Sequence, residues 1–130
     1  MEEASRGDPR VKYLGRVSEE EKMRLYQSSW AVLSTSFVEG WGMTDTEANA
    51  CRTPVLGYAT GAIPELVRDG VNGLLVRYGD VRGLASLMQR ALDERFSASL
   101  WEGSYRESLK YDWDLTASAY EDYLESMPRR

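Results

Sequence analysis

The sequence predicts an α/β protein in which a parallel β-sheet carries helices on both faces. Short apolar segments alternate along the chain with longer segments of helical pattern. The helical period is clearest after Asp80, where Leu84, Leu87, Met88 and Ala91 recur at i, i+3, i+4 and i+7. Strands that alternate with helices favour a parallel sheet, because a helix is the usual crossover between parallel strands. A chain of 130 residues is long enough to bury one such core.

The elements can be assigned in chain order. Residues 1–10 are polar and contain Asp8-Pro9, so we expect a flexible arm followed by one domain over residues 11–130. About four strands are expected, at residues 12–14, 31–34, 55–58 and 74–76. Helices are expected after Ser18, at 44–51, after Asp80, and near 98–110 and 115–126.

Two local patterns support these helices. Ser18 is followed three residues later by Glu21, which forms a capping-box pattern at a helix start. In the segment 98–110, Trp101, Tyr105 and Leu109 recur at a spacing of four residues. This spacing places the three large side chains on one side of a helix, so we expect them to form a core stripe.

The composition excludes several classes of function. The net charge of −5 argues against a nucleic-acid surface. Histidine is absent, so the chain supplies no imidazole base and no histidine ligand for a metal. Cys51 is the single cysteine, which excludes an internal disulfide. No apolar run is long enough to cross a bilayer and no secretory signal is evident, so we expect a cytoplasmic protein without a transmembrane segment.

The most informative segment is residues 39–47, EGWGMTDTE, between an expected strand and an expected helix. Such a turn presents free backbone N–H groups and the positive end of a helix dipole, which favour an anion such as phosphate. Gly40 and Gly42 allow tight dihedrals and the close approach of a ligand. Glu39 and Glu47 would repel a phosphate, so they are better explained as acceptors for the hydroxyls of a sugar or ribose. The combination indicates a nucleotide-sugar.

Simpler interpretations of the same segment compete with this one. A Gly-x-Gly after a strand is weak evidence by itself, and Asp45 stands where the dinucleotide fingerprint needs a small residue. Glu47 could be a solvated helix residue, and Glu39 could cap a turn. From the residues alone, magnesium on Glu39, Asp45 and Glu47 also stays possible.

An ordered series of motifs extends this segment along the chain. The motifs are VKYLG at 11–15, WAVLSTSFVEGWG at 30–42, TEANACRTPV at 46–55 and GAIPELVRDGVNGLLV at 61–76. Together they resemble the C-terminal domain of family 4 retaining glycosyltransferases with the GT-B fold, over roughly residues 11–126. The resemblance implies a Rossmann-like sheet that binds a nucleoside-diphosphate sugar, the donor.

The resemblance also implies a role for each matching position. Glu39 corresponds to the catalytic-site glutamate near the donor sugar, and Glu47 to the glutamate that accepts bonds from the ribose hydroxyls. The backbone N–H groups of the turn hold the distal phosphate or the sugar, through Gly40, Trp41, Gly42, Met43 and Thr44. The loop against the base corresponds to Gly15, Arg16 and Val17, where a plain strand-ending turn is equally compatible. No cofactor and no metal are expected, because GT-B enzymes generally work without a bound metal.

The chain matches only part of the family's C-terminal domain. The family sheet has the strand order 3-2-1-4-5-6, and aligned by motif this chain begins at strand 3. Three parts of the family pattern have no counterpart in this chain. They are the first two strands, a basic Arg and Lys pair for the donor diphosphate, and the N-terminal acceptor domain. We therefore expect a partial GT-B C-terminal domain, from an excised piece or a short gene product. Its exposed sheet edge could be filled by a second copy, giving a homodimer. Arg52 stands where the family commonly has glycine.

These observations predict the donor-binding part of a hexosyltransferase that moves a sugar to an unknown acceptor. The isolated chain is expected to be inactive, since part of the donor clamp and the acceptor domain lie outside it. Two other functions stay open: a donor-binding subunit of a split glycosyltransferase, and a non-catalytic module that binds sugar nucleotides.

Overall fold

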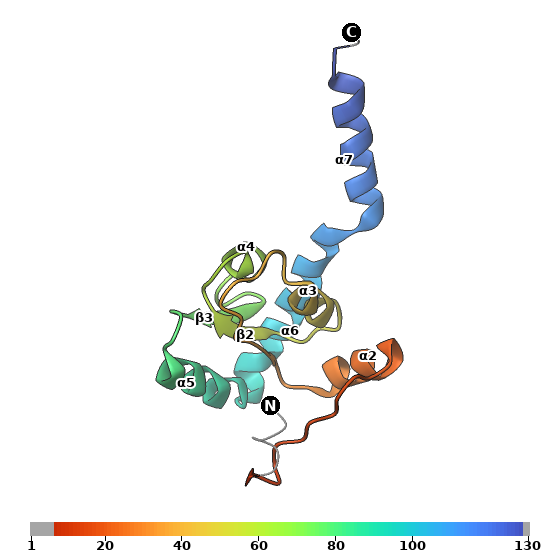
Figure 1. Cartoon of the computed structure of the whole chain (residues 1–130). Coiled ribbons are helices and arrows are strands. Elements are labelled where there is room, and N and C mark those ends of the chain that lie inside the picture. Colours follow the sequence, from red (N-terminus) through yellow and green to blue (C-terminus); the bar gives the residue numbers. More distant parts are fainter. Residues whose placement is uncertain (1–6, 129–130) are drawn as a thin grey trace.

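The computed structural model describes residues 7–128 and has a parallel sheet of three strands in the order β1-β2-β3. The strands are β1 (Val32–Ser34), β2 (Val55–Tyr58) and β3 (Gly73–Val76). The helices are α2 (Glu19–Ser28), α3 (Met43–Ala50), α4 (Ile63–Leu66), α5 (Val81–Ala91), α6 (Glu94–Ser108), the 3₁₀ turn η1 (Leu109–Tyr111) and α7 (Trp113–Ser126). Helices connect the parallel strands, so the predicted α/β class is confirmed (Figure 1).

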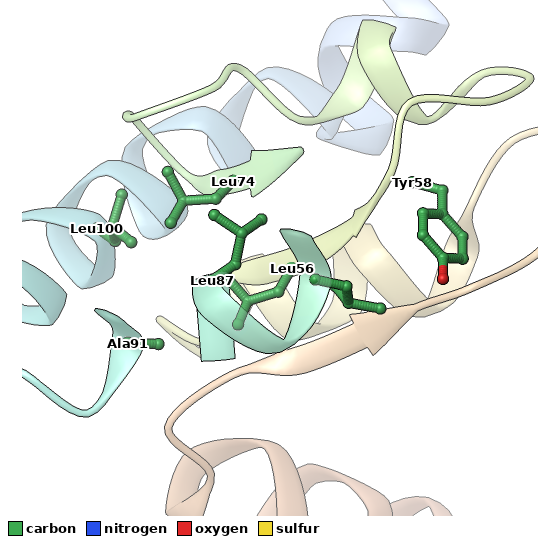
Figure 2. Packing of buried hydrophobic residues seen from close by; sticks show 7 residues of the cluster. Leu56, Tyr58, Leu74, Leu87, Ala91 and Leu100 are labelled. Atoms are coloured by element: carbon green, nitrogen blue, oxygen red, sulfur yellow. The ribbon is translucent and has the colours of Figure 1, made fainter. Parts of the chain in front are cut away.

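Alternation along β2 divides the core between the two faces of the sheet. Leu56 and Tyr58 pack with side chains of β3, α5 and α6 in one cluster, shown in Figure 2. Val55 packs on the opposite face with Ile63, Leu66 and Val67. Leu84, Leu87 and Ala91 of α5 are buried, as the helical period predicts, but Met88 of the same series is 44% exposed.

Capping side chains set where the helices begin. The Ser18 hydroxyl accepts a hydrogen bond from the Glu21 N–H at 3.2 Å, so α2 begins as the capping-box pattern predicts. Asp80 caps α5 by accepting from the Gly83 N–H at 2.8 Å. α6 begins earlier than predicted, because Asp93 accepts from the N–H groups of Arg95 and Phe96 and starts the helix there.

The prediction of a strand at residues 12–14 is wrong. No strand forms there and these side chains are exposed, so the sheet has three strands rather than about four. A strand needs a neighbour for its backbone N–H and C=O groups. In the expected strand order this segment would be separated from β1 by strands that the described residues do not contain. The outer edge of β1 consequently has no neighbouring strand within residues 7–128.

The predicted core stripe on the helix at 98–110 is also wrong. Trp101 is half-buried, while Tyr105 and Leu109 are 40% and 55% exposed. The buried face of α6 is instead made of Ser97, Leu100, Gly103, Ser104 and Glu107. A side chain at position 103 would clash with the Val71 carbonyl, so α6 approaches the body through its small residues. The large side chains of Trp101 and Tyr105 therefore lie beside this contact and not within it.

The last helix differs from the others in its packing. α7 extends away from the sheet (Figure 1), and none of its residues is buried. Its aromatic residues Trp113, Tyr120 and Tyr123 are between 65% and 84% exposed. Within residues 7–128, no helix is both long enough and apolar enough to cross a membrane.

Candidate functional site

The turn between β1 and α3 requires glycine at position 42. Gly42 is the N-cap of α3 and has a φ of 82°, in the left-handed region that other residues avoid. A Cβ at this position would lie 2.8 Å from a methyl carbon of Leu66 and 3.1 Å from a carboxylate oxygen of Asp45. The turn therefore packs directly on α4 while Trp41, Met43 and Thr44 stay exposed around it.

Glu39 is held at this turn through both its side chain and its backbone. Its carboxylate accepts a hydrogen bond from the Gly42 N–H at 3.1 Å. Its backbone carbonyl accepts from the Ala62 N–H at 3.2 Å. Gly61 has a φ of 52°, and a Cβ there would lie 2.6 Å from the same carbonyl. The loop before α4 thus sets the position of Glu39, a packing role for which the sequence motif GAIPE is the signal.

Asp45 is a buried carboxylate in the first turn of α3. It is 3% exposed, and it accepts a hydrogen bond from the Ser34 hydroxyl at 3.0 Å, at the carboxyl end of β1. Burial raises the pKa of Asp45, the Ser34 bond lowers it, and the negative charge of Glu39 raises it further. The sequence drew attention to Asp45 as a break in the dinucleotide pattern and as a conceivable magnesium ligand, but did not indicate that it is buried.

Glu47 lies further along α3 and faces α2. Its carboxylate pairs with the Lys22 ammonium at 3.0 Å and accepts from the Tyr26 hydroxyl at 3.4 Å. Bonds to Glu19 and then Glu47 raise the pKa of Lys22, while burial and then the charge of Glu47 raise the pKa of Tyr26. Sequence reasoning missed both partners, although their i, i+4 spacing already places them on one side of α2.

The structure gives the two glutamates of the motif different neighbours. Glu39 contacts the turn itself, and Glu47 contacts α2. The segment with Gly15, Arg16 and Val17 precedes α2, and Gly15 has a φ of 66°. Gly15 and Arg16 are exposed, and Val17 is half-buried. In the part of the chain that the structure describes, no group of three or more histidine, cysteine or acidic side chains could hold a metal ion.

Comparison with known families and proteins gives a consistent result. A family model described as "Glycosyl transferases group 1" matches residues 3–110. A D-inositol 3-phosphate glycosyltransferase of Mycolicibacterium smegmatis is 34% identical over 110 residues, which cover 85% of this chain and 25% of that protein. A protein of the same name from Nocardioides is 34% identical over 110 residues, covering 84% and 24%. The chain spans about a quarter of the length of these curated relatives.

Solved structures show the same fold. Anabaena Alr3699/HepE, solved in complex with UDP, superposes with a TM-score of 0.84 and 28% identity, over 92% of this chain and 33% of that one. The same protein has also been solved in complex with UDP-glucose, with a TM-score of 0.81 and 27% identity over the same shares. Sucrose-phosphate synthase of Thermosynechococcus elongatus has a TM-score of 0.83 at 24% identity, over 96% and 33%, and shows the fold alone.

Proposed function

Because the chain belongs to the glycosyl transferases group 1 family, we propose that it binds the nucleoside-diphosphate sugar of a retaining, family 4 type glycosyltransferase. The observation that carries this proposal is the turn from β1 into α3, where Glu39 is held against the Gly42 N–H and α3 begins directly after it. UDP-glucose is the donor we propose first, since it is the ligand named for the 27% identical Anabaena structure.

The diphosphate would bind at the start of α3. The first N–H groups of a helix have no partner inside the helix, and the dipole there favours negative charge. Met43 and Thr44 are the first two residues of α3 and are both exposed, so their N–H groups are the donors we assign to the distal phosphate. The same groups would stabilise the charge that develops on the leaving diphosphate during transfer.

The two glutamates would accept hydrogen bonds from the alcohol groups of the donor. We assign Glu39 to the hydroxyls of the sugar and Glu47 to those of the ribose. Lys22 and Tyr26 hold the Glu47 carboxylate toward α2, so we assign them as positioning residues. Gly15, Arg16 and Val17, just before α2, are the segment we assign to the base.

The test is a calorimetric titration with UDP and UDP-glucose, compared with GDP, ADP and their glucose conjugates. A hydrogen bond to a carboxylate contributes about 1.5 to 3 kcal/mol, so Glu47→Ala should weaken binding about tenfold or more. Glu125→Ala, on the exposed face of α7, is the matched control and should leave binding unchanged. Donor binding that is the same in Glu47→Ala and in the native chain would remove the assignment of that residue.

Transfer itself is proposed for the longer protein, since the relatives named as glycosyltransferases are matched over only about a quarter of their length. We propose that residues 1–130 by themselves bind donor without transferring its sugar to an acceptor. Release of UDP from UDP-glucose by the isolated chain, at a rate abolished by Glu39→Gln, would contradict this.

A further inference from the structure

A hollow lies at the opposite end of the sheet from the β1–α3 turn. It is a groove of about 840 Å³ between the C-terminal ends of α2 and α3 and one side of α6. Trp30 precedes β1 and Thr53 precedes β2, so the groove opens at the amino ends of these strands. The candidate donor turn follows the carboxyl end of β1, which separates the two places by the length of the strand.

Three aromatic side chains line this groove. The rings of Trp30 and Trp101 have centroids 5.8 Å apart and are inclined at 48°, so they form an open angle rather than a stack. Trp30 is 44% exposed, and Tyr105 completes the row on α6. Side chains of this size usually bury their rings in a core. Here they present ring surface to a concave, accessible space.

Arg52 is held beside these rings in an unfavourable backbone conformation. Its φ is 64°, and it is the residue after the C-cap of α3, where glycine is strongly preferred. The turn is a Schellman motif, because the Thr53 N–H bonds the Ala48 carbonyl and the Arg52 N–H bonds the Asn49 carbonyl. A strained position occupied by a long side chain suggests that the side chain has a use.

The side chain of Arg52 lines the groove with its charge already balanced. Its guanidinium carbon lies 4.8 Å from the centroid of the Tyr105 ring, and the group pairs with Glu102. The pair offers hydrogen-bond donors and acceptors together, without net charge. Gln27, Ser28 and Ser29 add further neutral polar groups to the lining.

We propose that this groove binds a neutral saccharide, at a site separate from the donor turn. A pyranose ring has an apolar face of C–H groups, which lies against an indole, and a rim of hydroxyls, which need both donors and acceptors. The open pair of indoles matches the first requirement, and the Arg52–Glu102 pair with its polar neighbours matches the second. The volume falls within the range of small-molecule sites, roughly 300 to 1,000 Å³. The inference does not depend on the donor-binding proposal.

The proposal can be tested by titrating the full chain with maltose and with cellobiose while observing the four tryptophan indole N–H signals by NMR. Single substitutions assign each signal. The Trp30 and Trp101 signals should shift with saccharide, whereas those of Trp41 and Trp113 should not. Arg52→Gly should weaken binding about tenfold, the effect of losing one good hydrogen bond. Trp113→Ala, on α7, should bind like the native chain.

The same variants separate a binding role for Arg52 from a structural one. Arg52→Gly relieves the left-handed strain, so its thermal midpoint should be no lower than that of the native chain even as binding falls. Arg52→Ala keeps the strain and loses the side chain, so it should bind as weakly and unfold at a lower temperature. Saccharide binding that survives unchanged in Arg52→Gly would overturn the role of this residue.

Two further outcomes would overturn the site itself. One is the absence of any shift of the Trp30 and Trp101 signals with either disaccharide at tens of millimolar. The other is a shift of these signals with UDP and not with saccharide, which would make the groove a nucleotide site. Glu47→Ala should weaken UDP binding about tenfold or more and leave the saccharide response intact, so failure of this proposal and failure of the donor proposal give different results.

Discussion

At the residue scale, the two ends of α3 concentrate the features that cost stability. Asp45 buries a carboxylate in the first turn, and Arg52 adopts a left-handed backbone just after the last. The Asp45 carboxylate accepts a bond from the Ser34 hydroxyl, and the Arg52 guanidinium pairs with Glu102 and lies over the Tyr105 ring. Buried charge and backbone strain persist in proteins mainly where they serve a site. The candidate donor turn and the saccharide groove lie at these two ends.

Asp45→Asn should stabilise the protein, by an amount that grows as the pH rises. The folded-state pKa of Asp45 is raised above its ordinary value of 3.8, so ionisation is easier in the unfolded chain. The contribution of the protonated Asp45 carboxyl to the free energy of unfolding is fully present below pH 3.8, and it is lost as the pH rises through the folded-state pKa. Asparagine does not ionise, and its side-chain oxygen can still accept the Ser34 bond. Urea unfolding of both proteins between pH 3.5 and neutrality measures the difference.

Comparing Asp45→Asn with the native chain at each pH removes the effect of other titratable groups on stability. Glu107 acts in the opposite direction, because its bond with Lys110 and then the nearby charges of Lys110 and Arg68 lower its pKa. Its contribution is lost as the pH falls, equally in both proteins. Asp122→Asn, the same substitution at an exposed position of α7, is the control variant. A stability difference between Asp45→Asn and the native chain that is constant with pH would contradict the prediction.

At the scale of elements, the outer edge of β1 has no strand beside it among the described residues. The Val32 N–H donates to the Pro54 carbonyl in the direction of β2. Successive backbone groups of a strand alternate in direction, so the Leu33 N–H points to the open side. Exposed edges of this kind pair readily with another strand. Leu33, the central residue of β1, has a side chain that is 45% exposed.

We therefore expect the isolated chain to form a dimer by pairing across β1. Leu33→Pro should shift it to a monomer, because proline removes the outward N–H and leaves the hydrogen bond between Val32 and Pro54 in place. Sedimentation velocity over a range of concentrations measures the change, and far-UV circular dichroism checks that the fold is kept. A native chain that sediments as a monomer at the highest concentration would refute the expectation.

At the scale of the whole molecule, one buried amide joins elements that are distant in sequence. Asn72 is 1% exposed, and its side chain donates to the Leu66 carbonyl at 2.8 Å and to the Asn49 side chain at 2.5 Å. It also accepts from the Arg68 N–H at 2.7 Å. The end of α4, the loop before β3 and the interior of α3 therefore depend on one side chain.

Asn72→Ala should destabilise the protein by about 3 kcal/mol, because each buried polar group left without a partner costs about 1 to 3 kcal/mol. Chemical unfolding measures the loss. Ser86→Ala, an exposed change on α5 whose hydroxyl bonds only the Arg82 carbonyl, should change stability by less than about 0.5 kcal/mol. A loss in Asn72→Ala no larger than in this control would show that water replaces the amide.

The sequence predicted well those features that depend on neighbours in the chain. The cap at Asp80, the helical period of α5, strand β2 and the strand-to-helix turn at Gly42 all follow from residues within a few positions of one another. The family motifs predicted the GT-B type of fold that the comparisons show. These interactions are local, so their signals survive in the amino-acid order.

Contacts between distant segments could not be predicted in this way. In the sequence, Asn72 and Gly73 form an Asn-Gly pair that is typical of a turn. In the structure, the buried Asn72 side chain makes hydrogen bonds with Asn49, Leu66 and Arg68. Trp101 and Tyr105 read as a core stripe, yet they line a groove because α6 packs through its small residues. Spacing along a helix identifies a side, but not the neighbour that this side meets.

The amino-acid order alone determined the α/β class, the place of the turn at residues 39–47 and the family to which its motifs point. Only the tertiary structure decided that Glu39 turns onto Gly42, that Glu47 pairs with Lys22, and that Asp45 is buried. It also decided that the segment at 12–14 is not a strand. The reason is the range of the forces involved: helix period and capping act within one turn of chain, whereas burial, ion pairing and strand pairing depend on segments brought together by the fold.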